Sequence, residues 1–124
     1  MAYEENVVTQ SYPAGANLSA SQYLIADVNA SGQAVVETSQ GANPIGVIYG
    51  NVSVAGRAVA IAVSGKLKIK ATAAITRGAQ VTVDTTTGGI ETAASGDYIL
   101  GKALEAATAT DDIIEILLVF FHHN

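Results

Sequence analysis

A chain of 124 residues fits one domain, and charged residues make up only 14% of it with a formal net charge of −5, which argues against a surface that grips nucleic-acid phosphates. The absence of cysteine excludes disulfides, thiolate metal sites and thiol nucleophiles. No segment has the roughly 20 apolar residues that cross a bilayer, and the N-terminus lacks a secretion signal, so we predict assembly in the cytoplasm with neither nucleic acid nor membrane as partner.

The first element is residues 1–21, which are rich in Ala, Ser, Asn, Gly and Pro and include Tyr3 and Tyr12. They show neither the period of a strand nor that of a helix. We predict an extended N-terminal arm here, followed by a single β domain over residues 22–124. The arm is either a frayed terminus or a segment that orders on a partner, with the tyrosines as anchors.

From residue 22 onward, short runs of β-branched residues alternate with turn residues at the spacing of a sandwich or barrel. This pattern predicts an all-β fold. The expected strands are Gln22–Val28, Gln33–Thr38, Ile45–Tyr49, Arg57–Ser64, Lys66–Ala71, Gln80–Asp84, Ile90–Ala93, Tyr98–Ala106 and Asp112–Phe121.

One expected strand shows its two faces plainly. Lys66, Lys68 and Lys70 alternate with apolar residues, so the three lysines project to one side of the strand. Such a stripe is usually a solvated or edge-protecting face. The functional alternative is docking to an acidic partner surface.

The last segment, residues 111–121, fits a helical apolar face as well as a strand. We predict a strand, because its Ile pair and its Val-Phe-Phe run suit a pleated surface. A continuous apolar strand needs burial on both faces. Contact with another copy of the chain, through Leu118 and Phe120, would supply that burial.

The sequence is similar to itself at an offset of 54 to 55 residues. Residues 36–38 align with 90–92, residues 45–47 with 100–102, and residues 58–63 with 113–118. The order of the motifs is the same in both halves, which predicts an internal duplication. We expect the two halves to pair around one closed core.

Three features suggest chemistry, and none of them is competent for it. Residues 96–103 approach the phosphate-binding pattern G-x-x-x-x-G-K-[ST], but Ala103 replaces the Mg²⁺-binding hydroxyl. Lys102 also resembles the carrier lysine of lipoyl domains, yet it lies in an apolar run without a turn residue beside it. His122 and His123 are adjacent at the C-terminus and cannot build a triad or a zinc site. We predict no catalytic, cofactor-binding or metal-binding residues.

The segments 64–69 and 74–81 resemble the middle of small tailed-phage capsid decoration proteins, the head cement proteins. Residues 86–90, 99–107 and 111–118 resemble their closing third, as a "tG-x-apolar" hairpin, an "iG-x-a-l-e-a" strand and a final apolar strand. The resemblance covers roughly residues 44 to 119 and consists of turn glycines and apolar spacing.

This resemblance implies a compact β-barrel-like or β-tulip fold and a homotrimer on the outside of the mature head. The trimer would clamp neighbouring copies of the major capsid protein. On this interpretation Tyr3, Tyr12, Lys66, Lys68 and Lys70 are candidate capsid contacts. Alternatives are a head-fibre or tail domain of the virion and a lipoyl-like binding module.

Overall fold

The computed structural model describes residues 5–38 and 44–118, and every regular element in this part of the chain is a β-strand. The predicted all-β fold class is confirmed. The strands are β1 (Glu5–Pro13), β2 (Ile25–Val28), β3 (Ala34–Val36), β4 (Gly46–Ile48), β5 (Ala58–Lys70), β6 (Gln80–Val83), β7 (Ile90–Thr92), β8 (Gly101–Ala103) and β9 (Ile113–Leu118).

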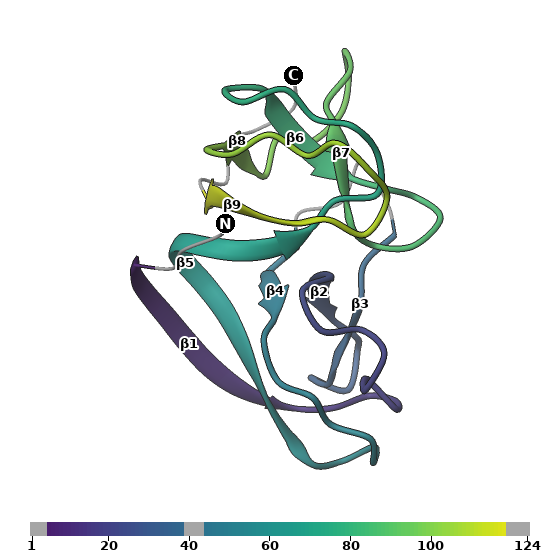
Figure 1. Cartoon of the computed structure of the whole chain (residues 1–124). Helices are drawn as coiled ribbons and strands as arrows, with labels where there is room; N and C mark the ends of the chain where they lie inside the picture. Colours follow the sequence, from purple (N-terminus) through teal and green to yellow (C-terminus); the bar gives the residue numbers. More distant parts are fainter. Residues whose placement is uncertain (1–4, 39–43, 119–124) are drawn as a thin grey trace.

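The strands expected after residue 22 lie where the sequence placed them, most with shorter ends, and residues 119–121 of the last one lie outside the described residues. Two of them, residues 57–64 and 66–71, are joined in the single strand β5. They are continuous because Gly65, between them, continues the strand with a φ of 111°. Glycine adopts this conformation without a Cβ clash, so β5 runs on from one half of the molecule into the other (Figure 1).

The N-terminal segment differs from the expectation of an arm without regular structure. Residues 5–13 form β1, which pairs antiparallel with β5 so that Tyr12 lies opposite Val59. Residues 8–11 are all exposed, so burial does not impose a two-residue period on their sequence. The pairing partner lies more than forty residues away in the chain, and no local signal reports it. The boundary between arm and domain near residue 21 stays a prediction.

The strand order confirms the internal duplication. The sheet runs β3-β2-β4-β5-β9-β8-β6-β7, with β1 also paired to β5. The order β3-β2-β4-β5 is thus repeated as β7-β6-β8-β9. Register agrees for these strands, since Ala26 faces Gly46 in one half and Val81 faces Gly101 in the other, each position shifted by 55 residues. The expected match of residues 36–38 with 90–92 is wrong by two residues, because the register of β3 and β7 aligns 34–36 with 90–92.

Strand β5 serves both halves. We call residues 8–64 the first repeat and residues 65–118 the second repeat. In the first repeat, β1 pairs with the N-terminal part of β5. In the second repeat, the C-terminal part of β5 takes the place of β1 and pairs with β9. The pair Tyr12–Val59 therefore corresponds to the pair Ile69–Ile114. Figure 1 shows the two repeats as two lobes, with β1 to β4 in one and β6 to β9 in the other, joined along β5.

Each repeat closes on itself. Ala14, directly after β1, forms a parallel bridge to Ala34 in β3, and Ala71, directly after β5, forms the same bridge to Ile90 in β7. The sheet of each repeat therefore curls until the residue after its first strand pairs with the strand at the opposite edge of the sheet, β3 in the first repeat and β7 in the second. Each repeat is a small barrel of the kind that the sequence predicted for the whole chain.

The expectation of one closed core is therefore wrong, because the buried residues form two clusters. One lies within the first repeat and includes Ile48, Val59 and Ile61. The other fills the second repeat and takes in Ile25 and Val47 from the first. The second cluster therefore holds the two barrels together.

Candidate contact surfaces

The three lysines predicted to share a face do so on β5, and the sheet register adds a fourth. Lys66 lies opposite Leu117 of β9, and Leu117 lies opposite Lys102 of β8. Side chains at directly opposite positions project from the same face of a sheet. Leu117 is 41% exposed between the two lysines. We call Lys66, Lys68, Lys70, Lys102 and Leu117 the lysine face.

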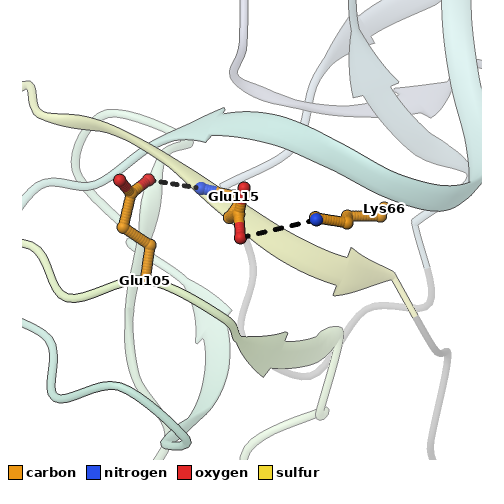
Figure 2. A network of polar contacts seen from close by, with 3 residues as sticks. All are labelled: Lys66, Glu105 and Glu115. Atoms are coloured by element: carbon orange, nitrogen blue, oxygen red, sulfur yellow. Dashed lines mark hydrogen bonds and ion pairs between the residues drawn. The ribbon is translucent and has the colours of Figure 1, made fainter. Parts of the chain in front are cut away.

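This face also carries acidic groups. The Lys66 Nζ atom lies 3.7 Å from Glu115 Oε1, and the Glu115 N–H donates to Glu105 Oε1 at 3.1 Å (Figure 2). The two side chains of the ion pair are 27% and 13% exposed, so solvent still screens their attraction. Four of the six Lys and Arg residues of a chain with net charge −5 nevertheless gather here.

The duplication explains why the lysine face is open. Its counterparts in the first repeat, Val47 for Lys102 and Ala62 for Leu117, are fully buried in the cluster that joins the two barrels. In the second repeat no described element covers the equivalent surface, since Lys102 and Leu117 are both exposed. Lys102 and Leu117 therefore correspond to a surface that the first repeat uses for contact between barrels.

The other candidate contact residues are placed differently. The Tyr12 hydroxyl donates to Gln10 Oε1 at 3.0 Å, and the half-buried ring packs against the first-repeat core. Leu118 is only 6% exposed and belongs to the second core, so it faces the interior of its own chain. Tyr3 and Phe120 lie outside the described residues. Sequence reasoning missed Leu117 because it expected both faces of β9 to be covered.

The segment that approached a phosphate-binding loop is built as a strand. Residues 101–103 form β8, and a Cβ atom on Gly101 would collide with the main-chain oxygen of Leu117. This glycine serves close strand packing rather than phosphate contact. Lys102 lies within β8 and not at a hairpin tip, which removes the geometric support for a carrier lysine.

Two aspartates are held by turn hydrogen bonds. Asp112 Oδ2 accepts from the N–H groups of Thr108 at 2.9 Å and Ala109 at 3.1 Å, which hold the pKa of this carboxyl below its usual range. Burial alone would raise the pKa of Asp84, but hydrogen bonds, chiefly from Thr87, outweigh it and lower the pKa. Both carboxylates stay ionised at neutral pH and stabilise turns.

Within residues 5–38 and 44–118, no group of three or more His, Cys, Asp or Glu side chains is placed to hold a metal ion. The same ranges contain no helix with the length and apolar character needed to span a membrane.

Two small barrels with closed cores and an open lysine face define a structural β protein whose distinctive chemistry lies on its surfaces. Comparison with protein families gives the family directly. The chain matches phage cement proteins over residues 7–118 and belongs to that family. It is therefore a structural protein of the phage capsid, where cement proteins act. A search of curated proteins found no match to this chain.

Proposed function

We propose that this cement protein binds the outer surface of the mature head, against the major capsid protein, as a homotrimer that assembles in the host cytoplasm. The observation that carries the proposal is the family match over nearly the whole described chain. Its action is adhesive and needs no catalytic residue. A ligand that binds the assembled lattice more tightly than the dissociated subunits stabilises the lattice by mass action.

Several weak contacts are enough for such a protein. When copies are linked in an oligomer, each further contact to the lattice becomes intramolecular, which raises avidity without a strong single site. Phe120 remains the prediction from sequence for the contact between copies, whereas Leu118 is buried within its own chain. Tyr3 and Tyr12 remain predicted contacts of the N-terminal segment with the head.

For the head contact we propose the lysine face. Its exposed Leu117 offers an apolar centre, and the lysines around it suit an acidic surface on the capsid. Charged groups around an apolar centre are the usual arrangement of a protein–protein interface. Long-range attraction would also speed the encounter of this face with an acidic lattice.

The function is tested by mixing the purified protein with expanded, undecorated heads. We expect saturable binding and a higher melting temperature of the heads, measured by calorimetry. Unexpanded heads are the control for specificity towards the mature lattice. Heads that bind no protein, or that bind it without thermal stabilisation, would contradict a cement function at this surface.

The site is tested by reversing charges on the lysine face. Lys68→Glu combined with Lys70→Glu should weaken binding to heads by about tenfold or more, because each favourable charge contact becomes a repulsive one. Arg57→Glu, compared with Lys68→Glu alone so that the change in charge is equal, is the matched control, since Arg57 is exposed and precedes β5 outside the face. Equal weakening by the control would show a general charge effect and exclude the face as the contact.

A further inference from the structure

The outer edge of β1 exposes main-chain groups. The oxygen of Ala60 in β5 accepts from the Tyr49 N–H at 2.9 Å, so Ala60 directs its main-chain groups towards β4 and away from β1. In an antiparallel pair the opposite residue points away in the same manner. Ser11 lies opposite Ala60, and Thr9, opposite Ala62, has the same parity. Their N–H and C=O groups therefore point outward, where no residue of the described chain bonds them.

In the second repeat, the main-chain groups of the equivalent edge are hydrogen-bonded. Lys68 and Lys70 of β5 hold the positions that correspond to Ser11 and Pro13 of β1. The Lys68 N–H donates to the Tyr49 hydroxyl at 2.8 Å, and the Lys70 N–H donates to the Tyr23 oxygen at 2.9 Å. Inside the chain, the edge of the second repeat is thus covered by residues of the first repeat. The equivalent edge of the first repeat lacks this cover.

The side chains of this edge do not protect it. Residues 7–13 carry no charge. Exposed edges in soluble proteins usually carry charges that prevent pairing with another chain. Val8 adds an apolar side chain that is 50% exposed. An edge with these properties is suited to contact with a protein.

We propose that a second copy of this chain covers the outer edge of β1 and bonds the main-chain groups of Thr9 and Ser11. The chain itself provides the precedent, because one repeat of this fold already covers the same edge of the other. Charge also favours a second copy as the partner. Each copy has a net charge of −5, and two such copies repel each other least where the residues that meet, 7–13, are uncharged.

The contact joins unlike surfaces. Within the chain the edge of the second repeat is covered by residues beside β2 and β4, and not by another first strand. A contact between unlike surfaces can close into a ring, which a trimer requires. The inference therefore deepens the proposed homo-oligomer and rests on it.

The test adds like charge at the proposed contact. Thr9→Glu with Ser11→Glu gives each acidic chain two further negative charges at the outward positions of β1, which repel a second copy there. We expect the mass in solution, measured by light scattering during size exclusion, to fall from an oligomer to the 12.6 kDa of one chain. Gln10→Glu is the control, because the main-chain groups of residue 10 face β5. It should keep the oligomer.

A second measurement uses the amide itself. Hydrogen exchange at the Ser11 N–H should be slow at high protein concentration and become fast on dilution, and Ser11→Pro should weaken the oligomer without loss of the β5 pairing. An oligomer that survives Thr9→Glu with Ser11→Glu overturns the inference. A wild-type monomer at micromolar concentration overturns it together with the proposed trimer, whereas the separate head-binding assay still decides the cement function. Variants that keep the oligomer but no longer bind heads would assign the edge to the capsid.

Discussion

Gly46 and Gly101 occupy equivalent positions 55 residues apart. Each lies in a strand, β4 or β8, that pairs with the last strand of its repeat, β5 or β9. A Cβ atom on Gly46 would collide with the main-chain oxygen of Ala62, and one on Gly101 with that of Leu117. Neither obstacle is a flexible side chain, so the strands themselves would have to separate. The apolar-glycine step that revealed the duplication in the sequence is therefore a packing requirement.

Gly101→Ala should lower the free energy of unfolding by about 2–4 kcal/mol, because the added methyl group meets main-chain atoms within the sheet. Gly96→Ala is the matched comparison. Its φ of 92° disfavours a side chain, but nothing lies near the added Cβ atom, so a loss of about 1 kcal/mol is expected. Urea unfolding measures both variants, and similar losses would contradict the packing argument.

Acid sensitivity follows from Asp112. Its folded pKa is lowered, so its contribution to stability is present above the ordinary aspartate pKa of about 3.9 and is lost as the pH falls through the folded value. Asp112→Asn should reduce stability at pH 7 and flatten the fall in melting temperature below about pH 4. Melting curves measured across this range test it, and an unchanged acid profile would assign the sensitivity to other carboxylates.

At the scale of elements, β5 determines how the two barrels meet. It is the last strand of the first repeat and the first strand of the second, so no linker separates them. The rings of Tyr23 and Tyr49 lie edge to face beside β5, with centroids 5.5 Å apart. The Tyr49 hydroxyl accepts a hydrogen bond from the Lys68 N–H, and the main-chain oxygen of Tyr23 accepts one from the Lys70 N–H. Tyr23 adopts a φ of 69°, and its counterpart Gly78 a φ of 89°. The turn shape is thus retained although the first repeat has a side chain there.

Tyr49→Phe should cost about 1 kcal/mol of stability, because the part-buried Lys68 N–H loses its acceptor. Tyr12→Phe is the control, since its hydroxyl bonds only the exposed Gln10 side chain and its loss should change little. Hydrogen exchange at Lys68 should accelerate in Tyr49→Phe alone. A protected Lys68 amide in that variant would show that another group covers this edge.

At the scale of the whole molecule, the two barrels are coupled because the larger of the two buried clusters contains residues of both. Ile25, from the first repeat, is 1% exposed and belongs to the cluster that fills the second. Most of the first repeat's remaining buried residues form a cluster of their own. The structure therefore predicts one cooperative unfolding transition, although the sequence is duplicated.

Ile25→Ala should lower the free energy of unfolding by about 2–5 kcal/mol and destabilise both repeats together. Val28→Ala, at a position that is 37% exposed on the same strand, should cost less than about 1 kcal/mol. Calorimetry tests the coupling directly. Two separate transitions in Ile25→Ala would show that the barrels unfold independently.

The sequence by itself determined the all-β class, the position of eight of the nine strands in the described part of the chain, and the duplication. These features depend on local signals, namely alternation within strands, glycine at turns and an apolar-glycine step repeated at a constant offset. The lysine stripe was also predictable, because alternation places residues 66, 68 and 70 on one face. The family resemblance used the same signals, and the family match over residues 7–118 confirms it.

Only the tertiary structure decided which strands meet. It revealed β1, whose exposed residues have no period and whose partner is distant in the chain. It placed Leu118 in the interior and Leu117 outside, since the two faces of β9 are distinguished by the surrounding strands and not by their own residues. It also added Lys102 to the lysine face and left the edge of β1 open. Both results depend on register between strands, which long-range pairing sets and a local pattern does not record.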